Sequence, residues 1–436
     1  MKGIFLVRKD AVARLFQIPR PNVRDFLLVE KRTVARWLFF FGILIAYYGT
    51  LNPWFMWPVA RYVHYLASVP VVAAMLFSKN LKKGIFNRSD YQQPFLACVA
   101  LQLVMALTSG KNINGIIVVA FSSVVYLSLL KLDRDELHRM ADMLTRSMAC
   151  ILVVSIPFYL LYLAGFSLPH SHVAATEWDY SFENYRFFLM DDRFATDLIP
   201  RFHSVFLEPS HLGMACIALL YAQIGKWHTW RCRILFLGLL MSFSLAAYLC
   251  LVVLVFSSAW MKGKAIVGKV ILLLSIVSSI VVGSIFYNKG QNLVNVLIVQ
   301  RLSTNSEGKI EGDNRTSDIF TKEYEKMAGS EQIFLGKGME AMERFGGSGN
   351  SGYRVFLYTY GLVSVFFLLI FFFFIFRTSD NARAKVAMSI ISLLSFVAHG
   401  IPIKYYFFIP LFVLIFSEVY PHQKQEKCLA KADGTD

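Results

Sequence analysis

Charged residues are scarce in this chain, and its cysteines follow no ordered spacing. Only 17% of the 436 residues are Asp, Glu, Lys or Arg, against roughly 25% in soluble domains. The six cysteines are neither paired nor grouped like metal ligands. We therefore expect neither a disulfide framework nor a zinc site.

Long apolar runs are what the chain has instead. Hydrophobic residues make up 56% of it, and the mean hydropathy is +0.51. About 20 helical residues cross the hydrocarbon core of a bilayer, where unpaired backbone groups are not tolerated. The sequence therefore predicts an all-α polytopic membrane protein, with residues 1–436 forming a single transmembrane domain of about twelve helices and no soluble domain.

The expected transmembrane helices follow the apolar runs. They lie near residues 37–51, 62–78, 94–108, 113–130, 147–168, 209–225, 270–287, 352–376, 385–398 and 405–418, with two more in 234–260.

Basic residues set the expected orientation of these helices. Residues 1–36 carry nine Lys or Arg against three acids, so this N-terminal segment is expected in the cytoplasm. It lacks the short apolar core and cleavage site of a signal peptide, and we expect it to remain in the mature chain. Alternation then places loop 169–204 and the large polar segment 288–352 in the periplasm, and the tail 419–436 in the cytoplasm.

The apolar stretch 234–260 decides whether this alternation is consistent. It has Arg231 and Arg233 on one side and Lys262 on the other, so both of its flanks are expected in the cytoplasm. We therefore divide it into a hairpin of two short helices that break at 242–244. Broken helices at membrane depth usually line a cavity.

Segment 288–352 has a near-neutral balance of eight basic and nine acidic residues, in contrast with the basic connectors. Phe320, Tyr324 and Met327 recur at helical spacing within 316–328, which predicts an amphipathic helix lying over the membrane face.

The candidate catalytic residues lie just before and inside the helix expected at 209–225. Pro209 suits the first helical position, so Glu208 falls at or beside the N-cap. Arg201, His203 and His211 surround it in sequence. This motif has two equally good interpretations. Glu208 could simply cap the helix, or it could form a functional site with the arginine and the two histidines around a substrate.

Arginines of the large segment are the candidate substrate-binding residues. Guanidinium groups make bidentate bonds to phosphate oxygens, so several of them would suit a phosphorylated lipid. For any single arginine, a solvated surface position is the better interpretation. Lys404 and His399 lie where a hairpin is expected to turn outside, and snorkelling explains such a lysine more often than function does. The substrate-binding candidates are Arg301, Arg315, Arg344, Asn350 and Arg354.

The formal net charge of +15 does not by itself indicate that the protein binds nucleic acid. Lys and Arg lie between apolar runs rather than on one basic face, and they serve as topology signals first.

Four short motifs together resemble a known family. The pattern R-F-x-x-x-F-x-E-P-S occupies 201–210, an S-x-S occupies 242–244, and a G-x-G follows an apolar pair at 334–338. Asn350 then precedes a Y-G helix at 360–361. In these motifs the second half of the chain is similar to bacterial O-antigen and exopolysaccharide polymerases, of the O-antigen ligase superfamily. Ligases carry a histidine before that asparagine, where this chain has Gly349, which favours polymerase over ligase.

The resemblance implies a bacterial inner-membrane enzyme. It would transfer a growing glycan from undecaprenyl pyrophosphate to a sugar hydroxyl of another lipid-linked repeat unit at the periplasmic face. Arginines would stabilise the leaving pyrophosphate without a metal or other cofactor, and Glu208 or a histidine would activate or orient the hydroxyl. The implied partners are the lipid-linked oligosaccharide, membrane lipid and a chain-length regulator protein.

Two other classes of function stay open at this point. A flippase for lipid-linked oligosaccharides would also have about twelve helices and a basic cavity, but its loops would be short. A structural or sensory membrane protein explains the helices but not the combination of Arg201, Glu208 and the loop arginines.

The expected topology makes a direct prediction. A reporter fused after Gly312 should be active in the periplasm, and one fused after Gly263 should report the cytoplasm, because the hairpin within 234–260 returns the chain to the inside. A cytoplasmic signal at Gly312 would contradict the hairpin and move segment 288–352 away from the periplasmic face.

Overall fold

A computed structural model describes residues 23–79, 84–110, 113–175, 180–192, 200–262, 317–345, 352–400 and 403–416, with scattered positions between 268 and 295. Residues 1–22, the tail 419–436, most of the helix expected near 270–287 and much of segment 288–352 lie outside the described residues.

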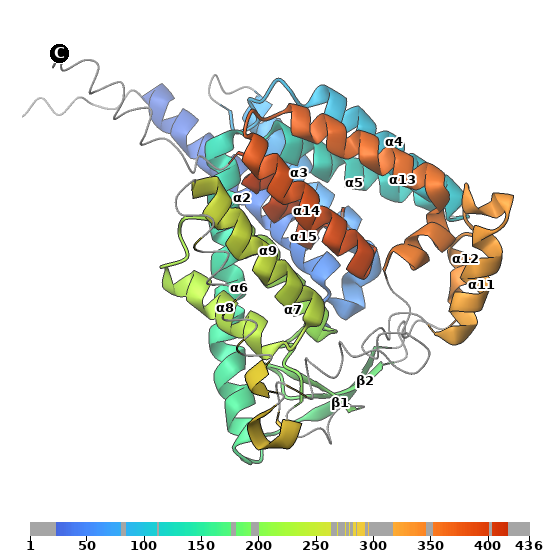
Figure 1. Cartoon of the computed structure of the whole chain (residues 1–436). Coiled ribbons are helices and arrows are strands. Elements are labelled where there is room, and N and C mark those ends of the chain that lie inside the picture. Colours follow the sequence, from blue (N-terminus) through green and yellow to red (C-terminus); the bar gives the residue numbers. More distant parts are fainter. Residues whose placement is uncertain are drawn as a thin grey trace, which may run out of the picture.

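Helices make up most of the described chain (Figure 1). In the first half they are α2 (Val23–Leu51), the 3₁₀ helix η1 (Trp54–Tyr62), α3 (Val63–Lys79), α4 (Gln92–Thr108), α5 (Ile113–Lys131) and α6 (Arg134–Leu163). In the second half they are α7 (Pro209–Ala222), α8 (Trp230–Met241), α9 (Leu245–Lys262), η3 (Tyr287–Gly290), α11 (Asp318–Ala328), η6 (Glu331–Ile333), α12 (Met339–Glu343), α13 (Tyr353–Arg377), α14 (Ala382–His399) and α15 (Tyr405–Leu414).

Several of these helices are apolar enough for a multi-pass membrane protein, as the sequence predicts. Within the described residues, six are also long enough to cross a bilayer: Lys31–Leu51, Trp54–Lys79, Ile113–Lys131, Arg134–Leu163, Tyr353–Arg377 and Ala382–His399. Four further apolar helices are shorter: Gln92–Thr108, Pro209–Ala222, Leu245–Met261 and Tyr405–Leu414. The count of about twelve spans stays a prediction.

The centre of the molecule is formed by the two shortest of these apolar helices, α7 and α15. Every residue of α15 is buried, and so is every residue of α7 from Leu212 to Ala222. The two helices pack against each other, and α2 and α6 contact both of them. Fourteen residues extend only about 21 Å, so α7 lies within a protein environment rather than crossing lipid alone.

The break expected at 242–244 is present. Helix α8 ends at Met241 and α9 begins at Leu245, and between them Phe243 has a positive φ of 46°. The apolar stretch is therefore two helices, as the distribution of basic residues indicates.

Helix α13 contains a second break that the sequence does not predict. Gly361 has φ 70° inside the helix, and the segment before α12 lies against this point. The Lys337 N–H donates to the Tyr358 carbonyl at 2.7 Å, and the Val363 N–H donates to the Phe334 carbonyl at 3.0 Å. A Cβ on Gly361 would lie 2.3 Å from that same carbonyl oxygen, so only glycine fits here.

The amphipathic helix expected in 316–328 is also present, as α11. Phe320 and Met327 are buried against Tyr358 of α13, and the Ser317 side chain caps the helix by accepting from the Phe320 N–H at 3.2 Å. Thus α11 and α12 form an arm that packs on the start of α13, at the right of Figure 1.

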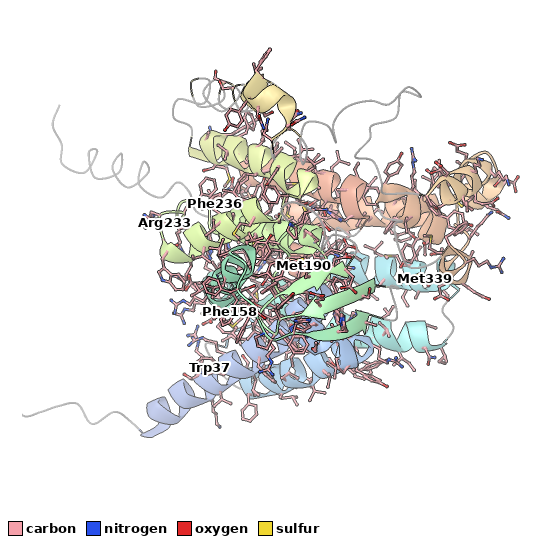
Figure 2. All side chains as sticks on the ribbon, turned by 90° about the horizontal axis from the view of Figure 1, so that it is seen from below. Trp37, Phe158, Met190, Arg233, Phe236 and Met339 are labelled. Atoms are coloured by element: carbon pink, nitrogen blue, oxygen red, sulfur yellow. The ribbon has the colours of Figure 1, made fainter. Side chains whose placement is uncertain are left out.

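Loop 169–204 contains a small sheet, which the all-α expectation leaves out. Strands β1 (Ser171–Ala175), β2 (Tyr180–Asn184) and β3 (Leu189–Asp191) pair antiparallel in that order. Phe182 and Leu189 pack with Leu207 in a small cluster of their own. Figure 2 views the molecule from the end that carries the sheet, with Met190 of β3 near the middle.

An ion cluster at the opposite end of α6 ties it to α2. Glu136 is 1% exposed and accepts two hydrogen bonds of 2.7 Å from the Arg36 guanidinium. Arg32 and Arg139 also contact it, each at 3.4 Å. Arg32 and Arg36, whose positive charges serve as topology signals in the sequence, therefore also hold two helices together.

We expect Glu136→Gln to lower the stability of the protein. The amide cannot receive the bidentate, charge-assisted contact, and hydrogen bonds to charged groups contribute about 1.5–3 kcal/mol. Thermal unfolding in detergent measures the change, with Glu325→Gln as the control because Glu325 is an exposed acid of α11. Equal melting temperatures for the two variants would mean that the cluster does not stabilise the contact between α2 and α6.

Candidate functional site

The start of α7 places Glu208 just outside the helix. Pro209 occupies the first helical position, and Glu208 is the N-cap residue with extended backbone at φ −138° and ψ 148°. The Glu208 side chain makes no capping hydrogen bond. Instead, the Ser210 hydroxyl donates to Glu208 Oε2 at 2.8 Å. The Glu208 side chain therefore does not cap α7 by a hydrogen bond, and its functional role stays a prediction.

Cationic and imidazole side chains from three other parts of the chain converge on this carboxylate. Arg201 in the preceding loop, His211 in the first turn of α7 and His399 at the end of α14 all interact with it electrostatically. Lys404, the N-cap residue of α15, does so as well. We call this group the Glu208 cluster, and it comprises Arg201, Glu208, Ser210, His211, His399 and Lys404.

Electrostatics keep Glu208 ionised. Burial by itself raises the pKa of the carboxyl, but His211, the hydrogen bond from Ser210, His399 and Arg201 outweigh this, and the net pKa lies below its ordinary value. A carboxylate of low pKa is a weak general base at neutral pH. It remains a good hydrogen-bond acceptor, which suits orientation of a hydroxyl group.

Burial has the opposite consequence for the lysine of the cluster. It lowers the pKa of the Lys404 ammonium, and the nearby Glu208 carboxylate opposes that change. Glu208 therefore helps to keep a positive charge at the start of α15.

Two helix N-termini meet at the cluster. Helix α7 begins at Pro209 and α15 begins at Tyr405, and the two helices pack together. The rings of His211 and Tyr406 lie 6.2 Å apart, which brings the two first turns together. The N-terminal ends of helices carry partial positive charge, so this arrangement adds to the attraction of Arg201 and Lys404 for an anion.

Arg201 connects the cluster to the break between α8 and α9. Its Nε donates to the Ser242 carbonyl at 3.4 Å, and the Phe202 N–H donates to the Met241 carbonyl at 3.2 Å. Gly213 of α7 packs against the same break, because a Cβ there would lie 2.7 Å from the Ala247 Cβ. The R-F-x-x-x-F-x-E-P-S and S-x-S motifs, about 40 residues apart, are thus in contact.

His203 is placed differently from the other catalytic candidates. It is 1% exposed, and its Nδ1 lies 2.5 Å from the Phe206 carbonyl, so Nδ1 carries the proton and donates. Its ring lies beside Phe182 of the sheet, with centroids 5.8 Å apart. Burial lowers the pKa of His203 to about 4. The ring is therefore neutral at pH 7 and holds the turn that leads to Glu208.

His211 is better placed for chemistry. It is partly exposed, and its Nδ1 is buried without a hydrogen-bond partner among the described residues. An unpartnered imidazole nitrogen beside Glu208 is a candidate for proton exchange with a hydroxyl group.

The two described loop arginines lie on the arm and at the start of α13, outside the Glu208 cluster. Arg344 is exposed at the end of α12 and acts electrostatically on Tyr358. The Arg354 Nε lies 3.4 Å from the Tyr353 hydroxyl, which accepts from it. The other three substrate-binding candidates, Arg301, Arg315 and Asn350, lie outside the described residues.

The start of α13 nevertheless adjoins the cluster. A Cβ on Gly352, its N-cap residue, would lie 2.7 Å from the Val397 carbonyl oxygen of α14. A Cβ on Gly400 would lie 2.6 Å from the Gly352 carbonyl oxygen. The end of segment 288–352 therefore reaches the position of His399.

His399 and Lys404 join the site, although neither is among the site residues predicted from the sequence. Their signal in the sequence is their position at an expected outer turn between apolar helices. A lysine at such a turn could equally well snorkel to the membrane surface. The sequence does not show that the turn lies near Glu208, which is about 190 residues away.

No protein-family model, curated protein or solved structure matches this chain.

The burial of His203 predicts a dependence of stability on pH. The unfolded histidine takes up a proton below about pH 6.5 and the folded one does so only near pH 4, so stability present above 6.5 is lost as the pH falls toward 4. The loss is at most roughly 3 kcal/mol. In His203→Asn the amide N–H can still donate to the Phe206 carbonyl, but the side chain does not titrate. The part of the pH dependence of stability that comes from His203 should therefore vanish.

Thermal unfolding between pH 4 and 7 measures the slope for the wild type, His203→Asn and the control His228→Asn, which alters an exposed histidine of the α7–α8 connection. Identical slopes in all three proteins would show that His203 is not the buried neutral residue described above.

Proposed function

We propose that this chain is a metal-independent membrane glycosyltransferase that polymerises lipid-linked oligosaccharide repeat units. It would move the glycan from undecaprenyl pyrophosphate to a sugar hydroxyl of a second lipid-linked unit at the periplasmic face of the bacterial inner membrane. The observation that carries the proposal is the Glu208 cluster, in which one carboxylate lies among cationic groups where two helix N-termini meet.

Contacts between the motifs support the same proposal. The E-P-S motif touches the S-x-S motif through Arg201 and Gly213. The G-x-G motif of 334–338 pairs with the Y-G break of α13 at Gly361. Motifs that are separate in the sequence thus form two contacting pairs, as expected if each pair contributes to one site.

The reaction requires that negative charge be stabilised on the leaving group. The acceptor oxygen forms a bond to the anomeric carbon, the bond from that carbon to the phosphate oxygen breaks, and undecaprenyl pyrophosphate leaves. Arg201 and Lys404, together with the N-termini of α7 and α15, would attract the pyrophosphate and stabilise the charge that develops on it. Arg301, Arg315, Arg344 and Arg354 remain candidates for binding the lipid-linked phosphates or the glycan, with Asn350 as a further polar contact.

The acceptor hydroxyl must also lose its proton. Glu208 would accept a hydrogen bond from the hydroxyl and orient it, and His211 would take the proton at Nδ1, which has no hydrogen-bond partner among the described residues. His203 would contribute indirectly, because its hydrogen bond to the Phe206 carbonyl holds the turn that precedes Glu208.

The proposal includes the full topology. It has about twelve spans and both termini in the cytoplasm. The sheet, the Glu208 cluster and the arm would then lie on the periplasmic side, where a chain-length regulator protein would bind the enzyme.

Deletion of the gene separates the proposal from its alternatives. Loss of the polymerase leaves surface chains with a single repeat unit, whereas loss of a flippase leaves no units at the surface. Loss of a ligase leaves polymerised chains that are not attached to their final acceptor.

Complementation of the deletion strain tests the site. Glu208→Gln should keep normal protein levels in the membrane and lose chain extension by about 10²–10⁴-fold, because the amide keeps the shape without the charge. Arg201→Ala should also lose extension, since each charged hydrogen bond contributes about 1.5–3 kcal/mol, and Arg201→Lys should restore little of it.

The readout is the ladder of polysaccharide lengths, normalised to protein in the membrane fraction. Arg233→Ala is the matched control, because it removes an exposed arginine from the start of α8 (Figure 2). Wild-type ladders from both Glu208→Gln and Arg201→Ala would overturn the assignment of this site.

A further inference from the structure

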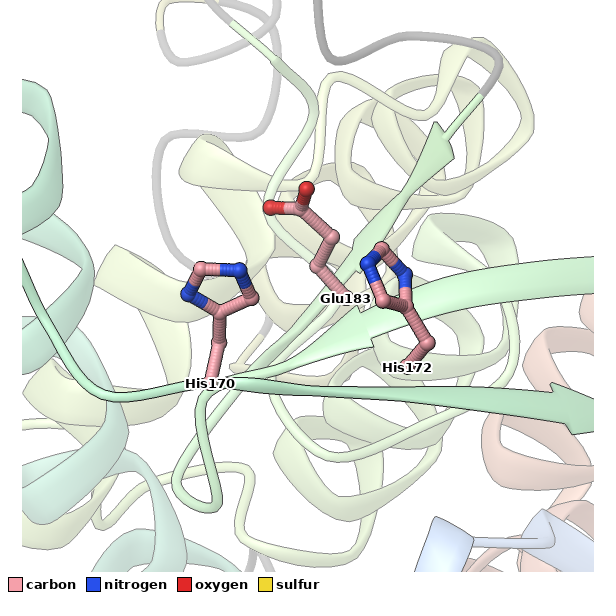
Figure 3. A group of neighbouring side chains, drawn as sticks. All are labelled: His170, His172 and Glu183. Atoms are coloured by element: carbon pink, nitrogen blue, oxygen red, sulfur yellow. The ribbon is translucent and has the colours of Figure 1, made fainter.

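A second group of chemically reactive side chains lies on the sheet, apart from the Glu208 cluster. His170, His172 and Glu183 each offer one ligand atom, and these atoms all lie within 4.8 Å of one another. Figure 3 shows the Glu183 carboxylate between the two imidazole rings. Both histidines are exposed and Glu183 is half-buried, so an ion could reach the group from solvent.

The backbone of the sheet brings the three side chains together. Residues two apart on an extended chain point to the same side, which places His170 and His172 on one face. In the antiparallel register of β1 and β2, His172 lies directly opposite Glu183. Directly opposed residues have Cβ atoms about 5 Å apart, so the hairpin itself holds a carboxylate beside two imidazoles.

Neighbouring groups fix the orientation of two of the ligands. The His170 Nδ1 lies 3.3 Å from the Leu168 carbonyl, so Nδ1 carries the proton and Nε2 offers its lone pair. The Tyr185 hydroxyl donates to Glu183 Oε2 at 2.6 Å. Hydrogen bonds of this kind, from a ligand histidine to a carbonyl and from a hydroxyl to a ligand carboxylate, usually support the ligands of bound metals.

We propose that His170, His172 and Glu183 bind a divalent transition-metal ion, and that this ion is zinc. Two imidazole nitrogens and one carboxylate oxygen form a ligand set that zinc prefers, whereas magnesium and calcium prefer oxygen alone. Ligands of a tetrahedral zinc lie roughly 3.3 Å apart, so zinc binding would draw together the three ligand atoms, which lie within 4.8 Å of one another in this structure.

Three protein ligands leave one position of a tetrahedral zinc ion open. Water or an anionic oxygen of a ligand would occupy it, as in zinc sites that are not purely structural. The site lies on the sheet, and its occupation would also tie β1 to β2. This inference is independent of the polymerase proposal, because it concerns a different part of the surface and a different chemistry.

Metal binding by the full-length protein in detergent, with any affinity tag removed, tests the inference. The wild type should bind one equivalent of Zn²⁺ in isothermal titration, and excess Mg²⁺ should not displace it. Co²⁺ in place of Zn²⁺ should give visible absorption of four-coordinate cobalt. His172→Ala and Glu183→Gln should weaken zinc binding at least tenfold, and Tyr185→Phe should weaken it about 10–100-fold.

His228→Ala removes an exposed histidine far from the sheet in sequence and is the matched control, so it should bind zinc like the wild type. Circular dichroism and retention volume confirm that each variant is folded. Absence of stoichiometric binding by the wild type would overturn the inference. So would equal affinity of the wild type, His172→Ala and Glu183→Gln, because the zinc would then be bound elsewhere.

Discussion

Proline has no N–H to donate and its ring fixes φ, so the first helical position, which Pro209 occupies in α7, is the one that suits it best. This constraint places Glu208 just outside a short helix that is buried on all sides from Leu212 to Ala222. Because α7 is too short to cross a bilayer alone, its first turn lies inside protein, where α15 and the end of α14 also meet. The carboxylate therefore lies among charged side chains and is partly shielded from water.

Breaks in apolar helices raise a related problem, because unpaired backbone groups are not tolerated in hydrocarbon. In this chain the breaks are covered by other parts of the protein. Segment 334–338 supplies backbone partners at the Gly361 break of α13, and Arg201 and Phe202 supply them between α8 and α9. The connecting segments thus complete the helical structure, and residues that close a break also shape the site.

Local rules predict part of this architecture and none of its long-range contacts. The start of α7, the break at 242–244 and the amphipathic α11 follow from proline chemistry, flanking charge and helical spacing. The sheet is missed because its strands are three to five residues long, too short for a clear alternation. The pairing of Glu136 with Arg36 and the approach of His399 and Lys404 to Glu208 depend on tertiary packing, which a single sequence does not reveal.

The charge balance at Glu208 gives the proposed reaction an order of events. In the protein alone, the cationic partners of Glu208 hold its pKa below the ordinary value, so it is a weak base. A pyrophosphate bound at Arg201 and Lys404 would share those partners and add negative charge nearby, and both effects raise the pKa of a carboxyl. Binding of the donor would therefore strengthen Glu208 as a hydrogen-bond acceptor at the moment when the hydroxyl must be oriented. An acceptor that arrives without a donor would meet a weaker hydrogen-bond acceptor at Glu208 and would be held less firmly for the reaction.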